Sequence, residues 1–293
     1  MRRNSYSLGL LLIIASTIAW STAGLFTRLL QTDLATTLVW RGVFGFLGIA
    51  AFTVLVEGRN GLMRFARLGR AGWIFAVISA FGMLTYIAAL THTSVAHVAI
   101  IYAAVPFVAA GLGWLVLREL PSRSAMLASL AALLGIVVMV GLGREGSAWG
   151  DFYAFLMTVS VASMMVFVRY APEMPALQAA ALSSLLSALV ALPLSAPLSP
   201  QGLDWITLAG FGIVNSSLGL ALFVLGSRRL PPVETALIGA LDAPLAPLWV
   251  WLLMSETPVT ATLLGGAIVF AAVITHILAS QKQSPAKDIA GKT

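Results

Sequence analysis

Long apolar runs follow one another along nearly the whole chain, and the links between them are short. A helix needs roughly 20 mostly apolar residues to cross a hydrocarbon core about 30 Å thick. The pattern therefore predicts ten membrane-spanning helices, at residues 8–27, 34–56, 72–90, 95–117, 125–142, 150–168, 175–194, 205–226, 233–254 and 260–279. The longest link, residues 57–71, has room for a turn of interfacial helix.

The two halves of the chain begin in the same way. The apolar run at 9–28 is bounded by glycine and arginine, and a run of the same length with the same boundary residues recurs at 150–169. A cleaved signal peptide would have no reason to recur in mid-chain, so we interpret the first run as a membrane span. A duplicated membrane pattern is typical of a transporter built from two related halves.

The basic residues indicate how the helices are oriented. If the N-terminus is cytoplasmic, the cytoplasmic segments hold every lysine and arginine except Arg28 and Arg144 outside and Arg41 within a span. This asymmetry follows the positive-inside rule and predicts that both termini are cytoplasmic. Five spans is an odd number, so the second half enters the membrane from the opposite side. We predict an all-α integral membrane protein whose ten helices form a 5+5 inverted repeat.

The expected domains are a first five-helix repeat at 1–145, a second, inverted repeat at 146–280, and a disordered cytoplasmic tail at 281–293. Composition agrees with a membrane protein, since 59% of the 293 residues are hydrophobic and 10% are charged, against about 25% charged residues in soluble domains. The net charge of +6 does not indicate nucleic-acid binding, because the basic residues lie between apolar runs without a recognisable motif. The absence of cysteine excludes disulfides and zinc–thiolate sites.

Three charged residues stand out within the predicted spans, where a charge is unfavourable by at least about 2.5 kcal/mol and is a functional candidate. Arg41 lies about 10 Å deep, and Asp242 lies about 14 Å deep, near the midplane, at a rise of 1.5 Å per residue. Arg41 either snorkels to the outer interface or binds a carboxylate. Asp242 lies in the transport pathway or pairs with a helix terminus or with Arg41. Asp242 and the more interfacial Glu234 share a helix face and are both candidates for proton coupling.

Several aromatic and polar side chains also lie inside spans. Trp20, Trp40, Tyr86 and Tyr102 each need a partner for a polar atom, and lining a central cavity would supply one, whereas plain helix packing is the alternative. Most intramembrane serines are expected to pack helices together. Asn215 is harder to explain as packing, because its amide has four hydrogen-bonding sites to satisfy. The candidates for substrate binding are Trp20, Trp40, Arg41, Tyr86, Tyr102, Ser163, Asn215 and Asp242.

Prolines occupy similar positions in the two halves. Pro106 lies in mid-span 13 residues before Glu119, and Pro244 lies in mid-span 12 residues before Glu256. Each proline removes a backbone donor and loosens a helical turn. A matched pair of such breaks indicates a binding site or hinge, so Pro106 and Pro244 are candidates for hinge or gating positions.

The segments VPFVAAGLGWLVLREL at 105–120 and APLAPLWVWLLMSET at 243–257 resemble the drug/metabolite transporter superfamily. The likeness covers residues 7–279 and is greatest to ten-helix EamA-type exporters, among them exporters of aromatic amino acids. The resemblance implies export across a bacterial-type inner (plasma) membrane, a central cavity between two four-helix halves, and peripheral fifth and tenth spans. The second half has no arginine matching Arg41, because the aligned position is near Ala181 or Leu182.

The leading functional hypothesis is export of aromatic or bulky apolar amino acids by alternating access, with Arg41 facing the carboxylate and Asp242 the ammonium group. A multidrug or lipophilic-cation exporter, using cation–π contacts and Asp242, is the alternative. A channel is less favoured because no repeated pore ring is present. No enzyme motif and no ATP-binding loop occur, so we expect neither an enzyme nor ATP hydrolysis.

We expect no cofactor and no metal. The expected partners are a small-molecule substrate and membrane lipid, with no nucleic acid, and a monomer suffices for one cavity. Proton exchange and facilitated diffusion both remain open as energy sources.

Overall fold

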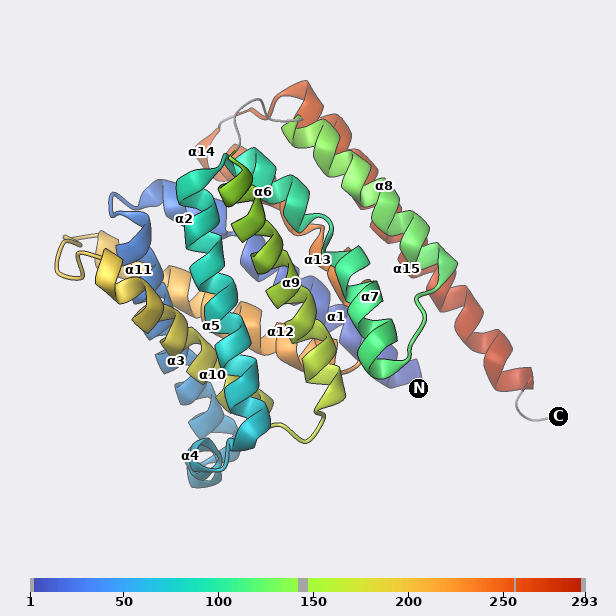
Figure 1. Ribbon diagram of the computed structural model, residues 1–293, viewed down its shortest axis with the longest axis horizontal. Coiled ribbons are helices and arrows are strands. Elements are labelled where there is room, and N and C mark those ends of the chain that lie inside the picture. Colours follow the sequence, from blue (N-terminus) through green and yellow to red (C-terminus); the bar gives the residue numbers. More distant parts are fainter. Residues whose placement is uncertain (1–2, 142–146, 256, 291–293) are drawn as a thin grey trace.

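The computed structural model describes residues 3–141, 147–255 and 257–290, and no β-strand occurs among them (Figure 1). Within this part of the chain, ten helical segments are long and apolar enough to cross a membrane, which confirms the predicted count. Large apolar side chains such as Leu55, Leu127 and Leu252 are exposed on the outside of the bundle. An outer surface of this kind suits lipid and not water.

The first repeat consists of α1 (Arg3–Ser21), α2 (Ala23–Leu29), α3 (Leu34–Glu57), α4 (Arg59–Ala66), α5 (Gly69–His92), α6 (Val95–Tyr102), α7 (Val105–Leu117) and α8 (Arg123–Val140). The second consists of α9 (Ala148–Tyr170), α10 (Ala176–Ala191), a short 3₁₀ turn η1 (Leu192–Leu194), α11 (Asp204–Phe211), a π-helical segment η2 (Gly212–Gly219), α12 (Leu220–Ser227), α13 (Pro232–Gly239), α14 (Asp242–Met254) and α15 (Thr260–Ala290). Helix α4 is the interfacial helix expected in the longest link. The backbone of α15 stays helical to Ala290, where the sequence predicts a disordered tail from residue 281.

The bundle has two distinct ends, which we name by their short helices. Helix α4 and both chain termini lie at one end, the α4 end, whereas α2, α11 and the C-terminal part of α14 lie at the other, the α2 end (Figure 1). At the α2 end, Asp33 caps α3 by accepting hydrogen bonds from the backbone N–H and the hydroxyl of Thr36, at 2.8 and 2.5 Å. Partial burial acts to raise the pKa of Asp33, but these hydrogen bonds outweigh it and hold the pKa below its ordinary value.

The fourth and ninth spans show the inverted repeat most clearly. Each consists of an eight-residue helix, a two-residue break and a 13-residue helix, α6–α7 in the first repeat and α13–α14 in the second. Each second helix ends in a left-handed residue, Arg118 and Ser255, both with φ of 58°. The α6–α7 span begins at the α2 end and the α13–α14 span at the α4 end (Figure 1). The predicted inverted repeat is therefore present in the fold.

Helices α8 and α15 form a pair at the edge of the bundle and lie side by side (Figure 1). Their backbones meet at two glycines. A Cβ added to Gly265 would lie 2.3 Å from the carbonyl oxygen of Gly135, and one added to Gly135 would lie 2.8 Å from that of Gly265. Small residues allow this close approach of membrane helices. The pair occupies the peripheral position expected for the fifth and tenth spans.

The close glycine contact gives a prediction about stability. Substitution of Gly265→Leu should separate α8 from α15 and destabilise the protein by about 1–3 kcal/mol through overpacking. Thermal unfolding of the detergent-purified protein measures the effect. Gly111→Leu is the matched control, because nothing lies within 4 Å of a Cβ added to Gly111. Equal unfolding temperatures for the two variants would show that the helices do not meet at these glycines.

Candidate functional site

A cavity of about 260 Å³ lies in the middle of the bundle, among spans from both repeats. Of the eight candidates for substrate binding, six line this cavity: Trp20, Arg41, Tyr86, Tyr102, Asn215 and Asp242. They come from six different spans, so residues far apart in the sequence meet at one place. The cavity is therefore the candidate binding site.

Four spans lose regular α-helical geometry around the cavity. The first is broken at Thr22, the fourth at residues 103–104 and the ninth at residues 240–241, and the eighth becomes π-helical between Gly212 and Gly219. Irregular backbone at membrane depth is tolerated where protein or a water-filled cavity surrounds it. Short π-helical segments are also frequent at functional sites. The concentration of these breaks supports a functional role for the cavity.

Asn215 joins three of the surrounding spans. Its Nδ2 donates to the carbonyl oxygens of Trp20 at 3.0 Å and Ala19 at 3.4 Å, next to the break between α1 and α2. Its Oδ1 accepts a hydrogen bond from Nη1 of Arg41 at 3.2 Å, and its backbone oxygen accepts one from Nε1 of Trp20 at 3.0 Å. The hydrogen-bonding capacity that singled out Asn215 in the sequence is used to fix the site.

Arg41 contributes a positive charge that the described residues do not neutralise. Besides Asn215, its guanidinium contacts Sδ of Met83 at 3.6 Å, and its central carbon lies 5.5 Å from the centre of the Phe211 ring. Its Nε is buried without a hydrogen-bond partner. Among the residues that the structure describes, none forms an ion pair with Arg41. A buried guanidinium without an ion-pair partner is well suited to bind an anionic group.

Asp242 contributes a carboxylate to the same cavity. It is the first residue of α14, where the partial positive charge of a helix N-terminus favours an anion. Within the described part of the chain it has no ion-pair partner, so the pairing with Arg41 considered from the sequence is not formed. Tyr86 and Tyr102 line the same cavity as Arg41 and Asp242. The two tyrosines therefore stand near the charged groups of the site.

Trp20 forms an apolar wall beside these charges. Its ring lies 5.0 Å from that of Phe223, centre to centre. A Cβ added to Gly219 would lie 2.5 Å from Cδ1 of Trp20, so only glycine leaves room for the indole in this orientation. The combination of the indole and its hydrogen bond to Asn215 agrees with the cavity-lining role predicted for Trp20.

Two of the eight candidates lie outside the cavity lining. Nε1 of Trp40 donates to the carbonyl oxygen of Pro197 at 2.9 Å, and its ring packs edge-on against Trp205 at 4.6 Å. The hydroxyl of Ser163 donates to the carbonyl oxygen of Val159, one turn earlier in its own helix, at 2.7 Å. Both side chains satisfy their polar atoms elsewhere, so we do not retain either as a binding residue.

The sequence did not single out several other residues of the lining. They are the serines Ser79, Ser183, Ser184, Ser187 and Ser216 and the apolar residues Met83, Met157, Met164 and Phe223, among others. Serine and methionine are common in helix contacts, so their types give little signal. The spacing of Ser183 and Ser187, one helical turn apart, was the available signal, because it places both on one face of α10.

The prolines and glutamates of the repeated segments lie around the cavity and not in it. Pro106 is the second residue of α7 and Pro244 the third of α14, each directly after a break, and their role as hinge or gating positions stays a prediction. Glu119 pairs with Arg169 at 2.7 Å at the α4 end. Glu234 is near the start of α13 and accepts a hydrogen bond from the hydroxyl of Tyr6 at 2.6 Å. Glu256 lies outside the described residues.

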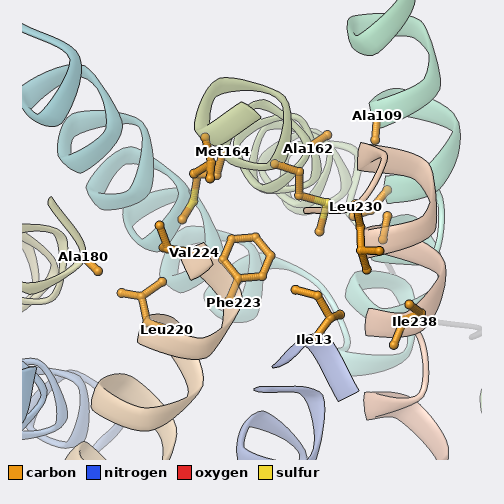
Figure 2. Close-up of a cluster of buried hydrophobic side chains, with 14 of the residues drawn as sticks. Ile13, Ala109, Ala162, Met164, Ala180, Leu220, Phe223, Val224, Leu230 and Ile238 are labelled. Carbon is orange, nitrogen blue, oxygen red and sulfur yellow. The ribbon is translucent and has the colours of Figure 1, made fainter. Parts of the chain in front are cut away.

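An apolar layer closes the cavity toward the α4 end. Figure 2 shows Phe223 at its centre, surrounded by Met164, Ile13 and Leu230 from other segments. Phe223 and Met164 also line the cavity, so we call this layer the floor. At the α2 end, by contrast, α2 and α11 pack together through stacked Phe26 and Phe211 rings, while α6 and α9 are joined by His97 and Asp151 at 3.0 Å.

Comparison with known proteins identifies the family. The model of the EamA-like transporter family matches the chain twice, at residues 7–141 and 148–278. The chain belongs to the EamA-like transporter family. The two matches agree with the two repeats, and the family consists of membrane transporters.

A solved crystal structure, described only as a crystal structure of a protein, superposes on this EamA-like transporter with a TM-score of 0.79. The two chains are 18% identical, and the match covers 97% of this chain and 99% of the other, so it supports the fold alone. No curated protein matches the chain.

The role of Asn215 can be tested by substitution. Asn215→Leu removes the partner of Arg41 and two donors to backbone carbonyls, and each buried group left unpaired is unfavourable by about 1–3 kcal/mol. We expect a lower thermal unfolding temperature in detergent. Asn60→Leu, at an exposed position on α4, is the control and should unfold like the wild type. An unchanged unfolding temperature for Asn215→Leu would contradict the central place of this amide.

Proposed function

We propose that this EamA-like transporter exports amino acids with aromatic or bulky apolar side chains, by alternating access. The observation that supports this best is the presence of a guanidinium, Arg41, and a carboxyl group, Asp242, in the lining of one cavity, neither with an ion-pair partner among the described residues. A zwitterionic substrate supplies the missing partner to each. Neither group needs to lose its charge when the substrate binds.

Arg41 is suited to receive the carboxylate of the substrate. Its guanidinium has free donor capacity at Nε and at Nη2, where the partner is only a thioether sulfur. Asn215 holds Nη1 and so fixes the plane of the fork. Two parallel hydrogen bonds from such a fork to a carboxylate give both affinity and orientation.

Asp242 is suited to receive the ammonium group. It belongs to the first turn of α14 and lines the same cavity as Arg41 and Tyr86. The hydroxyls of Tyr86 and Tyr102 are available in the lining to hydrogen-bond the polar end of the substrate. This assignment leaves the side chain of the substrate to the apolar walls.

The remaining lining favours an apolar side chain of moderate size. Trp20 and Phe223 offer aromatic faces, and Met157 and Met164 offer flexible apolar contacts that adapt to different shapes. The volume of about 260 Å³ lies near the lower limit of small-molecule sites, about 300 Å³. This size favours an amino acid over a larger drug molecule.

The proposed orientation in the membrane rests on the basic residues. Arg64, Arg169 and Arg228 belong to the segments that the positive-inside rule assigns to the cytoplasm. The α4 end is then cytoplasmic, in a bacterial-type inner membrane, and the floor closes the cavity on that side. Opening of the α4 end requires the floor to separate, and the breaks before Pro106 and Pro244 are the places where α7 and α13 can tilt. Under this proposal the structure corresponds to the outward-facing state of the transport cycle.

Substrate counterflow in liposomes that contain the purified protein tests this proposal. Vesicles preloaded with phenylalanine should accumulate labelled tryptophan from outside. Arg41→Ala should reduce the accumulation about 10- to 100-fold, since a hydrogen bond to a charged group contributes about 1.5–3 kcal/mol. Arg67→Ala, at an exposed position after α4, is the matched control and should transport normally.

The same assay separates the multidrug alternative. Asp242 beside Tyr86, Tyr102 and Trp20 would also accept a lipophilic cation. A cation exporter would exchange lipophilic cations and not amino acids, and Arg41→Ala would leave that exchange intact or increase it. This pattern, or an unaltered exchange of tryptophan by Arg41→Ala, would contradict the amino-acid proposal.

A further inference from the structure

A second cavity, of about 420 Å³, lies at the α4 end beyond the floor. It is formed by α7, the start of α8, the end of α9 and the start of α13. Its polar lining includes Glu119, Arg169, Ser122 and Glu234. None of these residues lines the central cavity, so this space is separate from the proposed amino-acid site.

Glu234 connects the second cavity with a buried polar cluster behind it. Its Oε2 accepts a hydrogen bond from the hydroxyl of Tyr6 at 2.6 Å, and its Oε1 lies 3.9 Å from Nε2 of His276. The imidazole is held at both nitrogens, with Nδ1 at 3.1 Å from the hydroxyl of Ser124 and Nε2 at 3.3 Å from that of Ser280. We call Tyr6, Glu234 and His276 the inner cluster. It joins α1, α13 and α15, with Ser124 adding α8.

The inner cluster is largely removed from water. The side chain of His276 is 1% exposed and that of Glu234 is 13% exposed, on the side of the second cavity. A histidine and a carboxylate this close inside a membrane protein are unusual, because a polar group there is unfavourable unless it is paired or functional. Neither residue takes part in the central site, so the cluster requires its own explanation.

The charges around the inner cluster leave room for one additional proton. From α9, Arg169 faces the second cavity but pairs with Glu119, which follows α7. After α12, Arg228 and Arg229 donate to the backbone oxygens of Met174 and Leu225. The described side chains that face Glu234 from α1, α8 and α15 are Tyr6, Ser124 and His276, and none is a permanent cation. With a neutral imidazole, the cluster carries the single negative charge of Glu234.

We propose that Glu234 and His276 share one exchangeable proton, that this proton reaches them from the α4 end through the second cavity, and that its binding drives the transport cycle. The part that concerns transport rests on the proposed amino-acid exporter. The proton-binding site itself does not.

The proton balance is simple. In the unprotonated state Tyr6 donates to the Glu234 carboxylate, and His276 has one ring nitrogen that donates and one that accepts. A proton that enters binds the ring nitrogen that carries no hydrogen, so both nitrogens donate and the imidazolium faces the carboxylate. The cluster then changes from one negative charge to a neutral ion pair. In a low-dielectric setting this removes an unneutralised buried charge and draws Nε2 of His276 toward Oε1 of Glu234.

The position of Glu234 links this proton to the substrate. Glu234 lies in the first turn of α13, and the same span continues through the break at 240–241 to Asp242 in the central cavity. The two carboxylates are eight residues apart, about 12 Å along a helix at 1.5 Å per residue. Helix α13 must move away from α1 and α15 if the α4 end is to open. A change in the strength of the interaction between Glu234 and His276 therefore changes the stability of the closed state directly.

Proton binding is tested first without any substrate. The chain has three histidines, so nitrogen-15 NMR of the labelled protein in detergent can assign His276 by comparison with His276→Gln. As the pH is lowered, the ring of His276 should convert from neutral to imidazolium in the folded protein. In Glu234→Gln the ring should remain neutral at pH values where the wild type is protonated. A ring that stays neutral throughout, or one that titrates identically in Glu234→Gln, would overturn the proposed site.

Coupling is tested in liposomes under two conditions. Glu234→Gln and His276→Gln should lose uphill accumulation of labelled tryptophan driven by a pH gradient, while both should keep counterflow at equal pH within about twofold of the wild type. His92→Gln, at the exposed end of α5, is the matched control and should keep both activities. A merely structural role would reduce counterflow as well.

The outcomes separate the two proposals. Gradient-driven accumulation in either variant at the wild-type level, or in the wild type without any dependence on the gradient, would overturn proton coupling. Failure of the wild type to move any amino acid would contradict the proposed substrate, and the NMR titration would still decide whether Glu234 and His276 bind a proton.

Discussion

The amide of Asn215 donates to the two carbonyl groups next to the break in the first span, and it accepts a hydrogen bond from Arg41. Without it, polar backbone near the bilayer midplane and a buried guanidinium would each lack a partner, which membrane proteins rarely tolerate. The same residue lies in the π-helical segment and positions the indole of Trp20 through its backbone oxygen. The local irregularity of two spans and the orientation of the charged site therefore depend on one side chain.

The fold is symmetric, but the chemistry of the site is not. Helices α7 and α14 have equal lengths and begin at equivalent positions, yet α7 begins with Val105 and α14 with Asp242. Similarly, the counterpart of Arg41 in the second repeat is near Ala181 or Leu182. An inverted repeat provides two alternative arrangements of the same helices, which suits alternating access. Arg41 and Asp242, neither of which has a charged counterpart in the other repeat, line one cavity.

The membrane spans and the two repeats could be predicted from the sequence because the patterns that determine them are local. The length of each apolar run predicts a span, and the repeated glycine, arginine, proline and glutamate positions predict the two halves. Depth in the membrane also follows from residue number, which is why Arg41 and Asp242 were found. The breaks before Pro106 and Pro244 had a local cause in the missing backbone donor.

Other features depend on tertiary contacts that the pattern does not contain. The break at Thr22 has no proline nearby and is stabilised by Asn215, nearly two hundred residues away. The π-helical segment and the floor arise from packing between distant spans. Trp40 and Ser163 became candidates by depth alone, which does not say which way a side chain points, and the polar atom of each has a partner outside the cavity lining.

The central proposal is that one cavity binds an amino acid between Arg41 and Asp242 and is reached from the α2 end. The most direct test is the accessibility of a single cysteine, which the chain permits because it contains none. Ser216→Cys, in the cavity lining, should react with a membrane-impermeant thiol reagent added from the α2 side and not from the α4 side. Phenylalanine should slow this reaction in a concentration-dependent way. Equal labelling from both sides, or labelling that phenylalanine does not affect, would contradict the account.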